Sequence, residues 1–189
     1  DIKEKTKVEH IIPQADGSFK VIAAMGEEYL SNHILLAIGR QGSPRKLGVP
    51  GEETEKVSYR LLEPERISGE TILVVGGGDS AIESALLLKD QNKVSLSYRK
   101  DKFARLKPKN REKILQAAEN GELEIIYNSN LLSINPSEVL IKIDEEEDIR
   151  QLENDRVFIF IGGELPTGFL QKAGVEITRR FGYIMKKHK

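Results

Sequence analysis

The stretch that decides the fold is ILVVGGGDSAIESA, residues 72–85. It begins within a β-branched run at 71–75, which predicts a short buried strand, and the three glycines that follow predict a tight turn. Residues 80–89 then predict an amphipathic helix, because their apolar side chains recur at helical spacing. The core face of this helix is expected to hold Ala81, Ile82, Ala85, Leu86 and Leu88. Ser80 and Glu83 have the spacing of a capping box at its start.

Strand and helix signals keep alternating after this helix. Residues 94–98 predict a strand, residues 108–120 a helix and residues 123–127 another strand. Pro108 in the first helical turn and Gly121 just beyond the last one are typical boundary residues. The β-α-β-α-β order predicts an α/β fold with a Rossmann-like parallel sheet, because parallel neighbours need crossover helices.

An antiparallel addition to this sheet is expected next. Residues 131–134 and 139–143 are apolar and are separated by the Asn135-Pro136 turn, which predicts a pair of antiparallel strands. The acidic block 144–155 is expected to be an exposed loop or the tip of a hairpin.

Both ends of the chain are predicted to be β-rich flanks. Residues 18–24 and 28–38 predict strands, and the continuous apolar run within the second, 34–38, predicts a strand buried on both faces. A loop rich in Gly and Pro follows it. Near the other end, residues 156–161 predict a strand, after which a short helix is expected.

Composition excludes several classes of protein. Of the 189 residues, 39% are hydrophobic and 31% charged, a globular balance. No apolar run approaches the roughly 18 residues of a membrane-spanning helix, and a secretory signal is not expected. Without cysteine the chain holds no disulfide and no redox dithiol, so a cytoplasmic location is expected. His10, His33 and His188 share no ligand spacing, and no metal site is expected.

The formal net charge of −1 hides two opposed blocks. Residues 97–113 are strongly basic, whereas residues 144–155 are strongly acidic. The near-neutral total argues against a nucleic-acid-binding protein. Binding of nucleic acid through 97–113 is the least favoured function, because only Tyr98 and Phe103 accompany the cations there as stacking side chains.

The glycine motif has the spacing G-x-G-x-x-A, and a strand precedes it while a helix follows, which is the fingerprint of dinucleotide binding. Gly76 permits the turn, Gly78 lets a pyrophosphate approach the backbone, and Ala81 lets the helix pack close to the strand. The helix N-terminus offers unpaired N–H groups to the phosphates. Candidate cofactor-binding residues are therefore those of the turn and the first helical turn: Gly76, Gly77, Gly78, Asp79, Ser80 and Ala81. A glycine-rich turn without a ligand is the alternative.

The cofactor preference is read from the end of the second strand. An NAD site usually places Asp or Glu about 20 residues past the glycines, to accept from the ribose 2′-OH. Here Tyr98, Arg99 and Lys100 stand in that zone, and Arg105 follows. Cations attract a 2′-phosphate, so NADP(H) is favoured over NAD(H). The alternatives are that the basic run is a solvated face and that Asp101 faces the ribose.

These motifs resemble the flavin-dependent pyridine nucleotide–disulfide oxidoreductases, and the thioredoxin reductase-like branch most of all. ILVVGGGDSAIESALLL resembles the NADPH fingerprint of that branch, and SLSYRKDKFAR resembles its basic phosphate-binding segment. LLAIGRQGSPRKLGVPGEE resembles the strand and linker that leave the flavin domain, and VFIFIGGELPTGFL resembles the strand that returns to it.

The resemblance implies three segments. Residues 1–51 would be a partial flavin-domain β segment with its linker, 52–152 the NAD(P)H-binding domain, and 153–189 the re-entry strand and tail of the flavin domain. It also implies FAD in the complete protein, a remaining flavin domain as partner, and a homodimer. Gly39 in the exit strand, Gly162 in the re-entry strand and Glu83 near the nicotinamide are added as cofactor-binding candidates.

Departures from the family pattern restrict the function that can be assigned to this chain. The FAD-site glycine motif and the Cys-x-x-Cys pair are absent, and Ile38 stands where the branch has Thr. No catalytic residue is therefore assigned. We expect the NADPH-binding portion of a flavin-dependent oxidoreductase, and the alternative is a module that binds NADP(H) for regulation or interaction without turnover.

Overall fold

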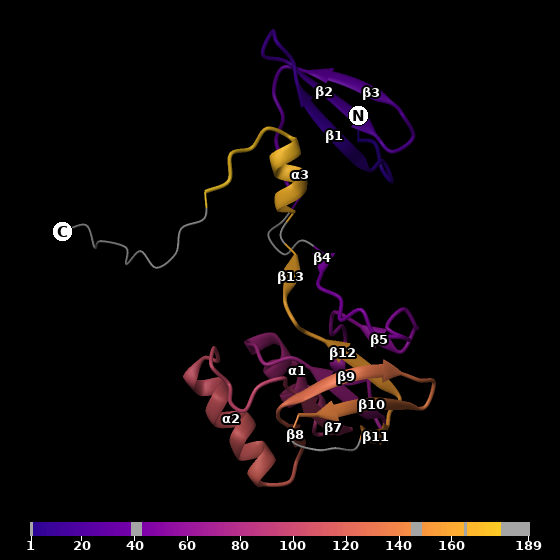
Figure 1. Cartoon of the computed structure of the whole chain (residues 1–189), viewed down its shortest axis with the longest axis vertical. Coiled ribbons are helices and arrows are strands. Elements are labelled where there is room, and N and C mark those ends of the chain that lie inside the picture. The colour runs from indigo at the N-terminus through magenta and orange to yellow at the C-terminus, as the bar shows by residue number, and fades with distance from the viewer. Residues whose placement is uncertain (1, 39–42, 145–148, 165, 179–189) are drawn as a thin grey trace, which may run out of the picture. The chain divides into compact units, whose positions relative to one another are not determined.

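The computed structural model describes residues 2–38, 43–144, 149–164 and 166–178. The chain divides into two compact units, drawn in Figure 1. The central unit comprises residues 44–163 and the split unit comprises residues 1–43 and 164–189. Each unit is described by itself below.

A five-stranded sheet forms the middle of the central unit, in the order β5-β12-β6-β7-β8. All four pairings are parallel. The strands are β5 (Val57–Ser58), β6 (Thr71–Val75), β7 (Lys93–Ser97), β8 (Glu124–Ile126) and β12 (Arg156–Ile159). Val75 pairs with Ser97 on one side and with Ile159 on the other, so these strands end at the same edge of the sheet. The predicted parallel α/β sheet is confirmed.

Two helices cover one face of this sheet. They are α1 (Asp79–Leu88) and α2 (Pro108–Glu119), and both lie within two residues of their predicted bounds. The predicted core face of α1 is buried at Ala81, Ile82, Ala85 and Leu88, which pack with Ile72, Val74 and Leu96 of the sheet. Burying each Ile, Leu or Val side chain of this layer contributes about 1.5–3 kcal/mol, which stabilises the strand and the helix on either side of the glycine turn.

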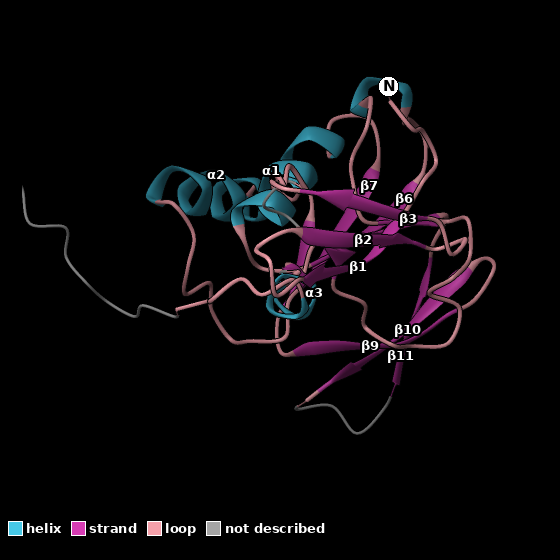
Figure 2. Ribbon diagram, turned by 90° about the horizontal axis from the view of Figure 1, so that it is seen from above, coloured by secondary structure: helices cyan, strands magenta, loops and turns pink. Residues whose placement is uncertain are grey.

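A separate antiparallel sheet covers the other face (Figure 2). Its order is β11-β10-β9, with β9 (Ser129–Ile134), β10 (Glu138–Ile143) and β11 (Ile149–Glu153). Its inner side chains pack on the parallel sheet, and the core there includes Leu73, Val75, Val139, Ile141 and Val157. The antiparallel addition is thus a third layer rather than an extension of the parallel sheet.

The Lys56 side chain ties the antiparallel layer to the segment before β5. Its ammonium group donates to the backbone carbonyls of Asn135 and Asn154 at 2.8 Å each and of Pro136 at 3.3 Å. Burial, partly offset by nearby carboxylates, lowers the pKa of Lys56. Lys56 is therefore a structural clip between the turn that joins β9 to β10 and the residue that follows β11.

The segment that leads into the central unit is fixed by a buried carboxylate. Glu52 is 6% exposed and accepts hydrogen bonds from the Leu47 and Gly48 N–H groups and from the Tyr59 hydroxyl. Burial alone would raise the pKa of Glu52, but these donors outweigh it and lower the pKa. Burial and the carboxylate together raise the pKa of Tyr59 to about 12.

Two short elements complete this part of the chain. A 3-10 turn, η1 (Pro64–Arg66), precedes β6. Where the chain passes from one unit to the other, β4 (Ser43–Pro44) pairs with β13 (Gly163–Glu164).

The described residues of the split unit form a three-stranded antiparallel sheet and one short helix. The strands are β1 (Val8–Pro13), β2 (Phe19–Ala23) and β3 (Glu28–Ser31), in the order β1-β2-β3, and the helix is α3 (Thr167–Lys172). The helix packs against β1, and Ile11, Ala23 and Ala173 are buried. The strand β1 was not expected from the sequence.

Three expectations differ from the structure. Residues 34–38 form no strand, and Leu35 is 92% exposed, because no neighbouring strand pairs with this run in the described chain. The acidic block is not all loop, since residues 149–153 form β11. The strand at 156–159 lies between β5 and β6 in the parallel sheet, so the compact central unit runs to 163 rather than to 152.

Across the described residues, no helix is both long enough and apolar enough to cross a bilayer.

Candidate functional site

The candidate site lies at the edge where the parallel strands end. From β6 the chain proceeds through α1 to β7 on one side, whereas β12 pairs on the other side of β6. The strand order therefore reverses at β6, and ligands of open α/β sheets bind outside the carboxyl ends of the strands at such a reversal. Residues 76–78 follow β6 directly and occupy this position.

Gly76 is required by the fold of the turn. Its φ is +146°, and an added Cβ would lie 2.4 Å from the Phe160 carbonyl oxygen and 3.1 Å from the Ala81 Cβ. Its N–H donates to the Ser97 carbonyl at 3.0 Å. The small residues at 76 and 81 therefore let β6, β7 and α1 converge.

Gly77 is required by an aromatic side chain. An added Cβ would lie 2.0 Å from Cε2 of Tyr98, so the tyrosine ring lies directly against this glycine. The same ring stacks on Phe103, with centroids 5.0 Å apart and planes inclined by 20°. Tyr98, predicted as a cofactor contact, thus also forms one wall of the glycine turn.

Gly78 faces open space. It is exposed, and an added Cβ would meet nothing within 4 Å. It is also the N-cap residue of α1, and no side chain caps this helix end. The N–H groups of the first turn are therefore free to bind an anion, and Gly78 leaves the approach unobstructed.

Ser80 and Glu83 do not form the predicted capping box. Ser80 is exposed within the first turn, because α1 begins one residue earlier than expected. Glu83 is exposed and instead accepts from the Asn110 amide at 2.8 Å, with the Lys107 ammonium 3.8 Å away. Glu83 therefore connects α1 to α2.

Asp79 faces α2 rather than the open side of the turn. Its Oδ1 accepts from the Asn110 side chain at 2.7 Å and from the Lys107 N–H at 3.1 Å. The Asn110 hydrogen bond is the main cause that lowers the pKa of Asp79, and burial opposes it. Because Lys107 is the N-cap residue of α2, Asp79 links the starts of the two helices.

The predicted basic residues lie on the segment between β7 and α2, here called the basic loop (residues 98–107). Arg99, Lys100 and Arg105 are exposed, and none of them has an ion-pair partner among the described residues. The loop begins next to the glycine turn, since Tyr98 packs on Gly77. The structure therefore brings the uncapped end of α1 and these cations to the same edge of the sheet.

Two further residues predicted to bind the cofactor, Gly162 and Gly39, add little to the description of the site. Gly162 is exposed at φ +94°, and its carbonyl accepts from the Arg45 N–H at 3.0 Å, so a turn after β12 explains the glycine. Gly39 lies outside the described residues. Phe103, Asn110 and Arg111 hold the site together but were not predicted as site residues, because their partners lie on other elements.

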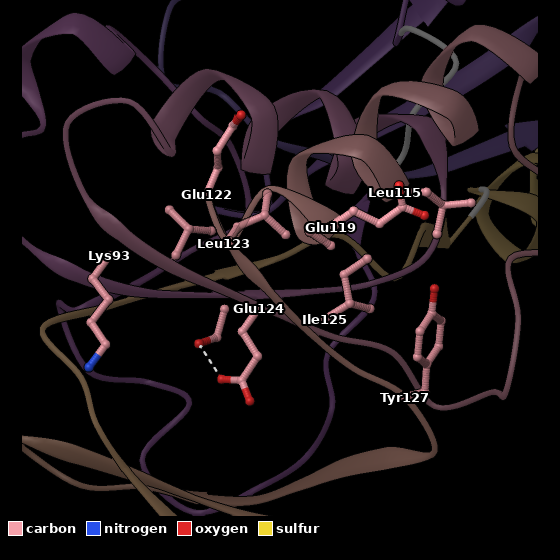
Figure 3. Close-up of a pocket in the computed structure, with 12 residues that line it drawn as sticks. Lys93, Leu115, Glu119, Glu122, Leu123, Glu124, Ile125 and Tyr127 are labelled. Atoms are coloured by element: carbon pink, nitrogen blue, oxygen red, sulfur yellow. Dashed lines mark hydrogen bonds between the residues drawn. The ribbon is translucent and has the colours of Figure 1, made fainter.

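The structure also has an open groove of about 610 Å³ between α2 and the sheet edge at β8 (Figure 3). Its lining includes Lys93, Leu115, Glu124, Ile125 and Tyr127. None of the predicted cofactor-binding residues lines it. The described residues contain no group of three or more His, Asp or Glu that could hold a metal ion.

The parallel sheet, the glycine turn at its carboxyl edge and the helix that follows define a Rossmann-type α/β fold. The sequence profile of the family described as pyridine nucleotide-disulphide oxidoreductase matches residues 1–187. The chain belongs to this family, as the resemblance implied. Flavin-dependent chemistry with a nicotinamide dinucleotide is the class that the family and its members indicate.

Two curated relatives are each 30% identical to the chain. Bacilliredoxin reductase Bdr from Bacillus subtilis (strain 168) matches over 164 residues, which are 86% of this chain and 50% of the relative. Ferredoxin--NADP reductase from Ignicoccus hospitalis matches over 142 residues, 75% of this chain and 46% of the relative. The chain thus spans about half the length of these relatives.

Solved structures agree with this assignment. The bacillithiol disulfide reductase Bdr from Bacillus cereus superimposes with a TM-score of 0.80 at 27% identity, covering 92% of this chain and 54% of that one. A thioredoxin reductase from Lactococcus lactis superimposes with a TM-score of 0.73 at 26% identity, covering 89% and 56%.

Proposed function

We propose that the central unit binds NADP(H) for a flavin-dependent oxidoreductase. The observation that carries the proposal is one juxtaposition: the uncapped start of α1, opened by Gly78, lies at the same edge of the sheet as the unpaired cations of the basic loop. A pyrophosphate fits the first feature, because unpaired N–H groups and the positive end of the helix dipole favour an anion.

The preference for NADP(H) rests on the charge of the basic loop. Arg99 and Lys100 follow β7 directly and have no carboxylate partner in the described chain, so they are available to a 2′-phosphate. Arg105 lies later in the same loop and is a third candidate. The name of the Ignicoccus relative, a ferredoxin--NADP reductase, is consistent with this preference.

The residues of this chain would bind and orient the dinucleotide rather than react with it. The turn at 76–78 would hold the pyrophosphate, and the basic loop would hold the 2′-phosphate. A flavin bound by the complete protein would supply the electron-accepting ring. The split unit would be part of the flavin domain, completed by segments outside this chain, and a homodimer and a cytoplasmic location remain further predictions.

Calorimetric titration of the intact protein with NADP⁺ and with NAD⁺ tests the cofactor preference. We expect NADP⁺ to bind at least about tenfold more tightly, because two additional charge-assisted contacts are made. Arg99→Met should weaken NADP⁺ binding by a similar factor and leave NAD⁺ binding nearly unchanged. Lys109→Met is the matched control, because Lys109 is an exposed cation on α2 and has no predicted contact.

Equal affinities for the two dinucleotides would contradict the NADP(H) preference. The flavin part of the proposal is tested separately, by the absorbance spectrum of the purified intact protein and by its oxidation of NADPH. A protein that binds NADP(H) tightly but holds no flavin and does not turn over would be the regulatory or interaction module instead.

A further inference from the structure

The basic loop has no helix or strand between the end of β7 and the start of α2, yet it carries the cations that the proposed function requires. A binding loop that is not held in place loses affinity, because ordering it on binding costs conformational entropy. The contacts that fix this loop in the protein are therefore relevant to binding, even where they touch no ligand.

The first contact is an aromatic cluster in the middle of the loop. Phe103 is 5% exposed, although its neighbours Lys102 and Ala104 are exposed. Its ring stacks on Tyr98 at 5.0 Å and meets Tyr127, after β8, at 5.4 Å with planes inclined by 57°. Phe103 thus fastens the centre of the loop to the ends of β7 and β8.

The second contact joins the same residue to α2. The Arg111 Nη2 donates to the Phe103 carbonyl at 2.7 Å, a charge-assisted hydrogen bond across the loop. Asp79 holds the end of the loop through the Lys107 N–H. Arg99 and Lys100 therefore lie between Tyr98 and Phe103, and the Lys100 carbonyl also accepts from the Asn128 N–H at 3.2 Å.

We infer that Phe103 and Arg111 are positioning residues for recognition of the 2′-phosphate. They give the basic loop its shape in advance, so that Arg99 and Lys100 meet the phosphate without an ordering cost. This inference rests on the proposed function, but it assigns a role to two residues that the proposed contacts with the dinucleotide do not include.

The test compares 2′,5′-ADP with 5′-AMP on the intact protein, because the two ligands differ by the 2′-phosphate. Phe103→Leu leaves the charge unchanged, and we expect it to weaken 2′,5′-ADP binding by about tenfold while 5′-AMP binding changes little. Arg111→Met should act similarly, and Arg111→Lys should restore part of the affinity, because an ammonium can still donate to the carbonyl. The matched control is Lys113→Met, which removes an equal charge from an exposed position of α2.

A double variant tests whether Phe103 and Arg111 act on binding through the same loop. Because both residues fix one loop, Phe103→Leu with Arg111→Met should cost little more than the larger single change. The inference is overturned if 2′,5′-ADP and 5′-AMP weaken equally in Phe103→Leu, or if Lys113→Met and Arg111→Met have the same effect. If the unchanged protein binds 2′,5′-ADP and 5′-AMP equally tightly, the proposed NADP(H) preference fails as well. If Arg99→Met alone loses the preference for 2′,5′-ADP, the NADP(H) preference stands but the positioning role is refuted.

Discussion

Each of the three glycines in the turn meets a different structural requirement. Gly76 adopts a positive φ against a backbone carbonyl, Gly77 gives space to the Tyr98 ring, and Gly78 borders open space. Of the three, only Gly78 would place an added Cβ with nothing within 4 Å. The sequence pattern alone treats them as one motif, although substitutions at these positions should have different consequences.

Replacing Gly77 and Gly78 by alanine should separate stability from binding. Gly77→Ala should lower the free energy of unfolding by about 1–3 kcal/mol, because its Cβ overlaps the Tyr98 ring. Gly78→Ala should unfold like the unchanged protein in urea, since it has an extended backbone and open space, but should bind NADP⁺ less tightly. If Gly78→Ala bound NADP⁺ with unchanged affinity, the close approach of the pyrophosphate to this residue would be refuted.

Glu52 predicts a pH dependence of stability. Its pKa is lowered in the folded protein, because the donors outweigh burial, so its stabilising effect is fully present above the unfolded pKa and is lost as the pH falls through the folded pKa. Glu52→Gln should therefore cost about 1–3 kcal/mol at pH 7. The difference from the unchanged protein should shrink as urea unfolding is repeated at decreasing pH below about 4.5. A difference that did not vary with pH would exclude an ionised Glu52 as its cause.

At the scale of elements, periodicity predicted β6, β7, β8, β12 and the helices α1 and α2, because each has its own apolar pattern. It did not predict the two-residue strand β5. It was wrong for 34–38, where burial on both faces requires neighbours that the described chain does not supply. It also missed β11, whose alternation of exposed and half-buried residues depends on pairing with β10. The site was predicted in part: the glycine turn is a local pattern, whereas the contact of Asp79 with α2 depends on how the helices pack.

The Lys56 clip can be tested as a link between elements. Lys56→Met should lower the free energy of unfolding by about 1–3 kcal/mol, because the carbonyls of Asn135 and Asn154 lose a donor where they are shielded from water. Lys46→Met, at an exposed lysine earlier in the chain, is the control and should change stability by less than about 0.5 kcal/mol. Equal losses of stability in the two variants would show that the loss comes from removing a positive charge and not from breaking the Lys56 hydrogen bonds.

At the scale of the molecule, the central unit contains both of its hydrophobic cores. All of the side chains in the two cores lie between Leu47 and Ile161. A unit with its own core is expected to fold by itself. Residues 44–163 produced alone should therefore show a cooperative urea transition and bind NADP⁺ with an affinity close to that of the intact protein. A fragment without a cooperative transition would show that the unit depends on the rest of the chain.

The pairing of β4 with β13 brings the two ends of the central unit side by side, and the Arg45 N–H donates to the Gly162 carbonyl at 3.0 Å across the same point. A module whose entry and exit strands are neighbours can be grafted into a surface loop of another protein without stretching either host strand. By the same geometry, a turn of a few residues could close the gap that its removal leaves. We therefore expect that residues 44–163 can be inserted into a surface loop of another protein through these two neighbouring ends.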